Sequence, residues 1–313
     1  MTYKNRLIFL VIIIAALAAI YTGSIIVNID FKTESETYAW LDPQAAEKVS
    51  RILLKTEYEE FELSKRNDIW MINHDGYEYP ARQLRVADFL SIFTTRAQWP
   101  VRSSSESSHE RFGLDDSASR ITIYGEYSVI LDLLLGKDDV MGMDTYFLKI
   151  GQNDVRSGDN NIKAYMTNAV SGWYNFRIIP ESETGSIDSG IVQRVSVYSG
   201  RETQVFTRSN MGWNISGINV TNPDINAIEN YVRNIISAEG DNFINDIDKN
   251  DPMFNKNRIE LEFGTGRRII IRASDPNIEG RRYVNISGRE QIYSLPPWAS
   301  ARLFKDASSF EMQ

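Results

Sequence analysis

The chain has 313 residues, of which 42% are hydrophobic and 24% are charged, an ordinary globular composition that argues against wholesale disorder. It contains no cysteine and only two histidines, His74 and His109, which excludes disulfide frameworks, thiolate metal sites and cysteine nucleophiles. The formal net charge of −8 argues against general nucleic-acid binding, because neutralising phosphates requires a basic surface.

One long apolar run lies near the N-terminus. Leu7 to Val27 reads LIFLVIIIAALAAIYTGSIIV, 21 residues without a charged side chain. At about 1.5 Å rise per residue, a helix of this length crosses a hydrocarbon core of about 30 Å. Lys4 and Arg6 precede the run, so the positive-inside rule predicts a cytoplasmic N-terminus and an exported remainder.

A cleaved signal peptide is the alternative for this run, since the small residues from Ala15 to Ala19 supply an Ala-x-Ala site. Cleavage there would leave Ile20 to Val27 as an apolar new N-terminus, whereas a mature chain normally turns polar after its signal peptidase site. The uncleaved anchor is therefore preferred. It places the protein in the inner (cytoplasmic) membrane, with the bulk of the chain on the extracytoplasmic, periplasmic face.

An internal repeat organises the rest of the chain. With an offset of 143 residues, Val49 to Ile72 aligns without a gap over Val192 to Ile215. Six positions are identical: Val49, Arg51, Glu59, Asn67, Trp70 and Ile72 meet Val192, Arg194, Glu202, Asn210, Trp213 and Ile215. Both copies alternate apolar and polar residues between turn signatures, which predicts three strands joined as a meander. The alternative is that β-rich sequences resemble one another by chance.

A proline follows each meander at the same offset, Pro80 in the first copy and Pro223 in the second, and a helical pattern follows each proline. The apolar positions are Val86, Phe89, Leu90, Phe93 and Ala97 in the first copy and Ile225, Ile228, Val232, Ile235 and Ile236 in the second. Asn222 stands where it could cap the second helix. The spacing predicts one amphipathic helix in each copy, with its apolar face packed on a sheet.

Further strand patterns follow each helix. At an offset of about 137 or 138, Arg120 to Tyr124 aligns with Arg258 to Glu262, and Tyr146 to Lys149 aligns with Tyr283 to Ile286. The remaining matches are Val129 to Leu135 with Arg268 to Arg272 and, more loosely, Trp173 to Phe176 with the region of Trp298 and Phe304.

The predicted fold class is α+β, an N-terminal transmembrane helix followed by two tandem, duplicated sheet-and-helix modules that are mainly antiparallel β with one amphipathic helix each. The predicted domains are a cytoplasmic tip and anchor at residues 1–30, a first module at 31–185 and a second module at 186–313. The polar, glycine-containing stretch Glu181 to Gly190 is the expected seam between the modules.

Candidate ligand-binding motifs are incomplete. Asp246 to Asp251 has the oxygen spacing that opens an EF-hand loop, but the sixth position holds Asp251 instead of glycine and the twelfth holds Asn257 instead of glutamate. A solvated acidic loop is therefore preferred over a calcium site. Gly264 to Gly266 is followed by another strand pattern, which predicts a hairpin turn and not a phosphate-binding loop.

The histidines and tryptophans favour structural interpretations over functional ones. His74 lies in a turn signature and His109 in a serine-rich loop, so both are expected to be exposed. Two pairs of tryptophans occupy equivalent places in the repeat, and these are expected in the core and not on a carbohydrate-binding platform, because each buries a large area. The six tryptophans of the chain are Trp40, Trp70, Trp99, Trp173, Trp213 and Trp298. The sequence predicts no catalytic, cofactor-binding or metal-ligating residue, and no cofactor.

Three short phrases carry a family resemblance. Phe112 to Asp116 reads Phe-Gly-Leu-Asp-Asp, Leu133 to Lys137 reads Leu-Leu-Leu-Gly-Lys, and Tyr146 to Leu148 begins a later strand. Together with the apolar run, these resemble the bacterial membrane-anchored family called domain of unknown function 4340. The likeness covers about Trp40 to Phe176 well and the second module loosely. The family often has proline two residues after Gly-Leu-Asp, where this chain has Ser117.

The resemblance implies a non-catalytic exported domain, of a kind commonly associated with ABC-type export systems of the gliding-motility type. We therefore expect a single-pass membrane protein, not an enzyme, whose extracytoplasmic domain binds an integral-membrane transporter or envelope protein as an accessory subunit. An extracytoplasmic ligand sensor or adhesin is the first alternative. An anchored envelope hydrolase that uses converging carboxylates is the second.

Overall fold

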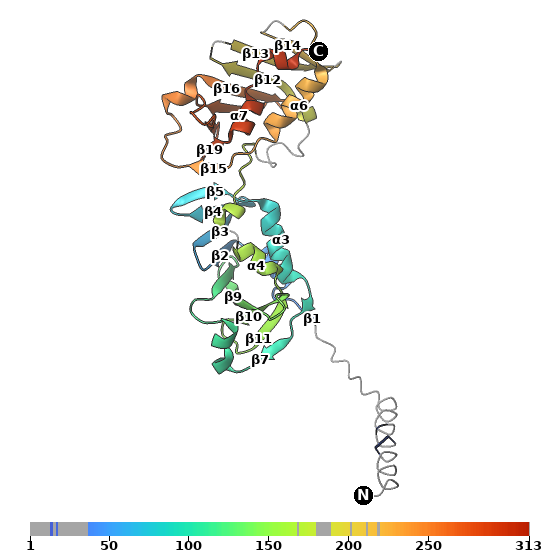
Figure 1. The fold of residues 1–313 in the computed structure, drawn as a ribbon, viewed down its shortest axis with the longest axis vertical. Helices are drawn as coiled ribbons and strands as arrows, with labels where there is room; N and C mark the ends of the chain where they lie inside the picture. The colour runs from blue at the N-terminus through green and yellow to red at the C-terminus, as the bar shows by residue number, and fades with distance from the viewer. Residues whose placement is uncertain are drawn as a thin grey trace, which may run out of the picture. The chain divides into compact units, whose positions relative to one another are not determined.

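The computed structural model describes residues 13–14, 17, 37–167, 169–179, 189–200, 202–210, 212–217 and 220–312. By their contacts, these residues form two compact units (Figure 1). The first unit consists of the described residues through Tyr77 together with Arg82–Trp173, and the second of Glu78–Ala81 together with the described residues from Tyr174 onward. Each unit combines a large sheet with a few helices, which confirms the predicted mixed α+β class with mostly antiparallel sheets.

The first unit is built on a nine-stranded sheet in the order β5-β4-β3-β2-β8-β9-β10-β11-β7, with a separate two-stranded ribbon of β1 and β6. The strands of these two sheets are β1 Thr37–Tyr38, β2 Arg51–Lys55, β3 Glu60–Arg66, β4 Ile69–His74, β5 Tyr77–Pro80, β6 Ala97–Gln98, β7 Val101–Ser103, β8 Ser119–Tyr124, β9 Val129–Asp138, β10 Asp144–Lys149 and β11 Val155–Asp159. All belong to the first unit except the last three residues of β5, which fall in the second. The helices of the first unit are α2 Pro43–Glu47, α3 Gln83–Thr94 and α4 Asn161–Thr167, with 3-10 turns η1 Glu106–Ser108, η2 Glu110–Phe112 and η3 Val170–Gly172.

Side-chain alternation gives this sheet one apolar face. In β2, Ile52 and Leu54 are fully buried while Arg51 and Lys55 are exposed, as expected for a strand with one face on a core. Trp173 lies at the centre of that core and contacts Phe61 of β3 and Phe89 of α3, with ring centroids 6.1 and 5.3 Å apart. The Trp173 side chain therefore packs between the apolar face of the sheet and the apolar face of α3.

The second unit is built on an eight-stranded sheet in the order β14-β13-β12-β16-β17-β18-β19-β15. Its strands are β12 Val192–Ser199, β13 Glu202–Ser209, β14 Gly212–Ser216, β15 Asn242–Ile244, β16 Asn257–Phe263, β17 Arg268–Ala273, β18 Arg282–Ile286 and β19 Ile292–Leu295. Its helices are α6 Ile225–Ile236 and α7 Pro297–Leu303, with 3-10 turns η4 Ser189–Ile191, η5 Pro252–Asn255 and η6 Ala307–Phe310.

The core of this unit repeats the same arrangement of sheet and helix. Phe206 of β13 and Tyr231 of α6 are fully buried, with ring centroids 5.4 Å apart, and Phe310 closes the cluster. The Tyr231 hydroxyl donates to the carbonyl of Leu303 at the end of α7, 2.6 Å away. Burial raises the pKa of the Tyr231 phenol, so the hydroxyl keeps the proton that it donates.

The two sheets share one strand order over seven strands. In the first sheet it runs β4-β3-β2-β8-β9-β10-β11, and in the second it runs β14-β13-β12-β16-β17-β18-β19. In each case the first strand of a three-stranded meander pairs antiparallel with the strand that follows the helix, β2 with β8 and β12 with β16. Additional edge strands distinguish the two sheets, β5 and β7 in the first and β15 in the second.

Both predicted helices are present, and two details of their ends differ. In α3, Val86, Phe89 and Phe93 are buried as predicted, but Ala97 belongs to β6 and not to the helix. The N-cap of α6 is Asp224 and not Asn222, because the Asp224 carboxylate accepts from the backbone N–H groups of Asn226 and Ala227 at 2.9 and 3.0 Å. A carboxylate one residue before the helix also interacts favourably with the helix dipole.

The expected module boundary, at residues 185 and 186, lies outside the described residues. Contacts divide the chain between Trp173 and Tyr174, so that the described residues from Tyr174 to Ile179 belong to the second unit. The reason is aromatic packing, since the rings of Tyr174 and Phe176 both pack against Phe243, edge-on and tilted respectively, with centroids 5.3 and 5.0 Å from it. The expected seam, Glu181 to Gly190, lies almost entirely outside the described residues.

Within the described residues, no helix is both long enough and apolar enough to span a membrane. The predicted anchor, Leu7 to Val27, lies outside them except for Ile13, Ile14 and Leu17. These three residues are helical, and their side chains are 42–61% exposed.

Candidate functional site

The faces of the two sheets that point away from the apolar core carry polar and charged side chains over the central strand pairs. We call these the first and second open faces. The first consists of Arg51, Lys55, Glu62, Arg120, Tyr124 and Asp132, and the second of Arg194, Tyr198, Arg258, Glu260, Glu262 and Arg268. They arise from alternation, since the neighbouring residues along β2, β8, β12 and β16 point into the core.

The first open face is held by ion pairs and one stacked cation. The Arg51 guanidinium carbon lies 3.7 Å from the centroid of the Tyr124 ring, directly across the β2–β8 pair, and its Nη1 is 3.2 Å from Glu62 Oε2. The Arg120 guanidinium donates two hydrogen bonds to the Asp132 carboxylate, at 2.8 and 2.5 Å. This bidentate contact raises the pKa of the Arg120 guanidinium.

The second open face repeats the motif with the residue types exchanged between strands. Here the arginine comes from β16 and the tyrosine from β12, and the Arg258 guanidinium carbon lies 3.9 Å from the centroid of the Tyr198 ring. Arg258 also pairs with Glu260 at 2.7 Å, and Arg268 with Glu262 at 3.4 Å. Charge therefore lies in alternating signs over β12, β16 and β17.

Each open face contains a shallow hollow over its central strand pair. The first, of about 260 Å³, lies over β2, β3 and β8, and the second, of about 200 Å³, lies over β12, β16 and β17. Small-molecule sites are usually larger, about 300–1,000 Å³, and predominantly apolar. Shallow polar hollows of this kind suit several polar contacts with a partner surface better than enclosure of one ligand.

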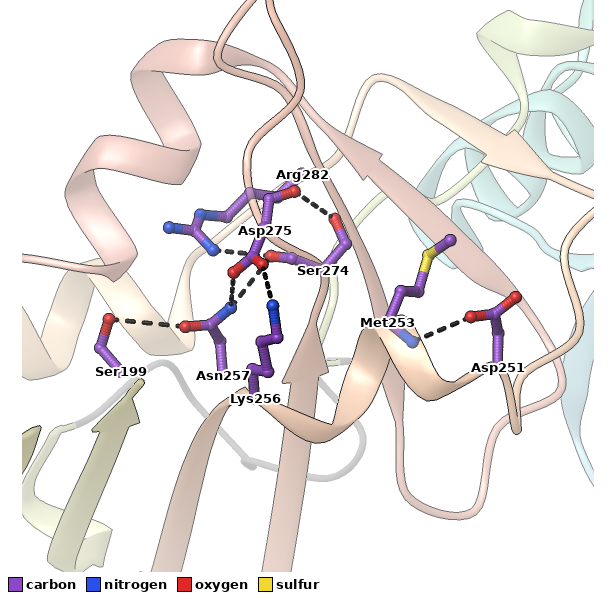
Figure 2. Close-up of polar contacts among 8 residues, drawn as sticks. All are labelled: Ser199, Asp251, Met253, Lys256, Asn257, Ser274, Asp275 and Arg282. Atoms are coloured by element: carbon purple, nitrogen blue, oxygen red, sulfur yellow. Dashed lines mark hydrogen bonds and ion pairs between the residues drawn. The ribbon is translucent and has the colours of Figure 1, made fainter. Parts of the chain in front are cut away.

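Two carboxylates of the acidic loop Asp246 to Asp251 accept hydrogen bonds from nearby backbone N–H groups. Asp248 accepts from the backbone N–H of Asn250 and Asp251 from that of Met253, both at 2.8 Å, and Asp251 thereby caps η5 (Figure 2). Among the described residues, no group of three or more histidine, cysteine, aspartate or glutamate residues could hold a metal ion.

A compact polar cluster lies next to this loop, where β16, β17 and β18 begin and end (Figure 2). Buried Asn257 donates to Asp275 at 2.9 Å, and Lys256 Nζ lies 2.9 Å from the second oxygen of the same carboxylate. The bond from Lys256, with that from Asn257, holds the pKa of Asp275 below its usual range. Arg282 donates to the Ser274 carbonyl at 2.6 Å, and burial lowers the pKa of its guanidinium. These mutual bonds give the cluster a structural role in joining three strands.

The two histidines are less exposed than predicted. His74 ends β4 with its side chain largely buried, and its Nε2 lies 3.7 Å from Glu59 Oε2 and 3.8 Å from Asp75 Oδ1. Glu59 Oε1 in turn accepts from the backbone N–H of Val170 at 2.5 Å. His109 is partly buried, with Nε2 3.2 Å from the Asn153 carbonyl oxygen. Both rings therefore link loops to neighbouring segments.

Five of the six tryptophans are buried, including three of the four at equivalent positions in the repeat, for which burial was predicted, and Trp298 is the exception. Trp298 lies on α7 and is 57% exposed, and Arg302 stacks on it with its guanidinium carbon 5.1 Å from the ring centroid. The ring borders a hollow of about 120 Å³ between α6 and α7. The alignment of Trp298 with Trp173 is the loosest match in the repeat, and the two side chains differ in burial, since Trp173 is fully buried.

The phrases that carry the family resemblance contact one another in the first unit. Phe112 and Leu114 are buried against Leu148 and Val155. A Cβ atom at Gly136 would lie 2.2 Å from the Phe112 carbonyl oxygen, which explains the glycine in the second phrase. Residues 70–256 match the family described as Domain of unknown function (DUF4340). The chain belongs to this family.

The DUF4340 match runs from β4 of the first unit to the end of η5 in the second, and so covers parts of both. No curated protein matches the chain. Within the DUF4340 region, Ser117 follows the Phe-Gly-Leu-Asp-Asp phrase directly. Its backbone N–H and its hydroxyl both donate to Asp115 Oδ1, at 2.9 and 2.6 Å, and these bonds lower the pKa of that carboxyl group. The hydroxyl thus gives this chain a turn contact that proline would lack.

Proposed function

We propose that this chain is a single-pass inner-membrane protein, anchored by Leu7 to Val27, with its bulk on the extracytoplasmic face. The observation that carries the proposal is the uncharged 21-residue run that follows Lys4 and Arg6 in the sequence. The apolar side chains of Ile13, Ile14 and Leu17 support it, because these three residues are helical and exposed, and exposed apolar side chains are favourable when lipid or protein surrounds them.

The two units are, in this proposal, copies of one ancestral module. The shared order of seven strands and the single crossover helix in each copy support duplication. The equivalent tryptophans Trp70 and Trp213 are both buried on the helix-facing side, at matching places in β4 and β14. Such a fold offers two similar binding surfaces on one chain.

The extracytoplasmic part acts as a non-catalytic accessory subunit of an ABC-type transporter or another envelope complex. The two open faces support a binding role, because arginine and tyrosine are enriched at protein interfaces and both stand there in fixed cross-strand pairs. Membership of DUF4340 supports the partner class through the association expected of that family with gliding-motility-type export systems.

Co-purification tests this function. Full-length protein extracted in mild detergent should carry an integral permease and its ATPase in a fixed ratio to the chain. A variant with Arg51→Glu and Arg258→Glu reverses one charge on each open face and should lose most of the bound partner while keeping its fold, since the two side chains are 44% and 43% exposed. Purification of the chain alone, at every detergent tried, would contradict the proposal.

An extracytoplasmic ligand sensor is the second candidate. The exposed Trp298 beside the α6–α7 hollow favours it, because exposed aromatic rings at hollows commonly bind apolar or sugar ligands. The hollow of about 120 Å³ has room for only a few atoms of a ligand, well below the usual size of a small-molecule site. The accessory-subunit proposal is therefore preferred.

A further inference from the structure

The hairpin that joins β9 and β10 exposes a group of apolar side chains. Residues Val140–Met143, which we call the β9–β10 tip, follow Asp138 and Asp139 directly. The side chain of Val140 is 104% exposed, that of Met141 79% and that of Met143 66%. Single exposed apolar residues are common, but three within four positions form a patch that usually marks an interaction site.

The backbone of the β9–β10 tip is held in place by its neighbours. Asp139 Oδ1 accepts from the backbone N–H groups of Met143 and Asp144, at 2.9 and 3.2 Å. Gly142 turns the chain with a φ of +68°, and its carbonyl accepts from the Asn160 side chain at 2.7 Å. A second bond joins Asn160 N–H to the Met143 carbonyl at 3.3 Å. The exposed side chains therefore stand on a pre-ordered turn.

Pre-ordering of this kind favours binding. A loop that is already fixed loses less conformational freedom when it docks, so more of the contact free energy appears as affinity. Methionine adds adaptability, since its unbranched thioether side chain fills irregular apolar recesses. A turn that only connected two strands would be served equally well by polar residues in these positions.

The charges around the β9–β10 tip indicate what kind of surface it fits. Asp138 is paired with Lys163 at 3.0 Å, and Asp144 with Arg102 at 3.4 Å. In the part of the chain that the structure describes, the side chains of Asp139 and Asp159 accept only uncharged N–H groups. Asp139 directly precedes the tip and Asp159 pairs with Asp144 across β10 and β11, so both add negative charge beside the apolar tip. Anionic lipid would repel these carboxylates, whereas a protein recess rimmed by lysine or arginine would attract them.

We propose that the β9–β10 tip is a docking element that inserts Val140, Met141 and Met143 into an apolar recess of a partner protein whose rim carries lysine or arginine. The proposal rests on the accessory-subunit function and adds the surface and the chemistry of the contact. It is independent of the open faces, which lie over the central strands and carry mixed charges.

Photo-crosslinking tests the proposal in cells that produce the full-length chain. A benzophenone amino acid is placed at Met141 in one variant and, as a matched control, at Tyr127 in another, because Tyr127 is 90% exposed at the hairpin turn before β9. Irradiation should give a discrete polypeptide adduct from position 141 and none from position 127. Mass spectrometry should locate the crosslink in an apolar recess of the partner bordered by lysine or arginine. Adding Met143→Glu should lower the adduct yield about tenfold.

Four results would overturn the proposal: no adduct from position 141, an adduct to lipid, an adduct to a second copy of this chain, or equal adducts from both positions. The test separates this inference from the proposed function. If permease and ATPase still co-purify with the chain while position 141 gives no adduct, the docking element is wrong and the accessory role stands.

Discussion

Trp173→Ala should lower the free energy of unfolding of the first unit by about 3–5 kcal/mol, the usual cost of truncating a fully buried tryptophan. Trp173 has no exposed surface and joins the sheet to α3 and α4, with its ring 6.1 Å from Phe61, 5.3 Å from Phe89 and 5.8 Å from Tyr165. Removing it leaves a cavity that these aromatic side chains cannot fill without leaving their own positions.

Hydrogen exchange measured by mass spectrometry on the full chain would report the change in the amides of β2, β3 and α3. Trp298→Ala is the matched control. It deletes the same side chain from an exposed site and should change stability by less than about 1 kcal/mol. Equal exchange in the Trp173→Ala variant and the unaltered chain would show that the first core is not built around this ring.

Tyr79→Ala should destabilise the second unit by about 2–4 kcal/mol, although Tyr79 precedes most of that unit by about a hundred positions in the sequence. The ring is 6% exposed and lies 4.8 Å, between centroids, from both Tyr174 and Phe243. Its hydroxyl accepts from the Asn245 side chain at 2.6 Å. The substitution removes both the packing and the acceptor.

Exchange of the amides in β15 and β19 would register this loss. Tyr77→Ala provides the control, since Tyr77 is two residues away, is the same residue type and is 48% exposed. It should leave exchange in β15 and β19 unchanged within error. A similar response to both substitutions would mean that Tyr79 contributes no more to the second unit than a surface tyrosine does.

Local sequence patterns predict the strands and helices of both units well, for physical reasons visible in single segments. Strict alternation in segments such as Asn257–Phe263 leaves only one way to bury Ile259, Leu261 and Phe263 together. The Gly264 to Gly266 hairpin also forms as predicted, with Gly266 at a φ of +80° between β16 and β17. A glycine in this region avoids the steric cost that other residues carry there.

Contacts between distant segments are what the patterns did not predict. Nothing near Tyr79 in the sequence shows that it packs on Phe243, and short strands such as β7, which pairs with β11, lack a readable period. Asp224 is the N-cap in place of Asn222, because the helix starts at Ile225 and two candidate capping residues this close together can be told apart only by where the helix starts. The prediction that Trp298 is buried was wrong for a related reason. Residues that align in a repeat can still have different neighbours in the two copies.

The candidate surfaces could be predicted only in part. The open faces follow from the same alternation that predicts the strands, but the Arg51–Tyr124 and Arg258–Tyr198 stacks require the strand register. The β9–β10 tip had a readable signal, because Val-Met-Gly-Met between aspartates is unusually apolar for a turn.

Site-specific labelling of introduced cysteines tests the central claim, that a single-pass anchor places both units outside the cytoplasm. The chain has no cysteine, so Thr2→Cys and Tyr127→Cys each give a single thiol. In intact spheroplasts, a membrane-impermeant maleimide should label Tyr127→Cys at once and Thr2→Cys only after the membrane is permeabilised. Labelling of Thr2→Cys in intact spheroplasts, or protection of Tyr127→Cys there, would contradict the account.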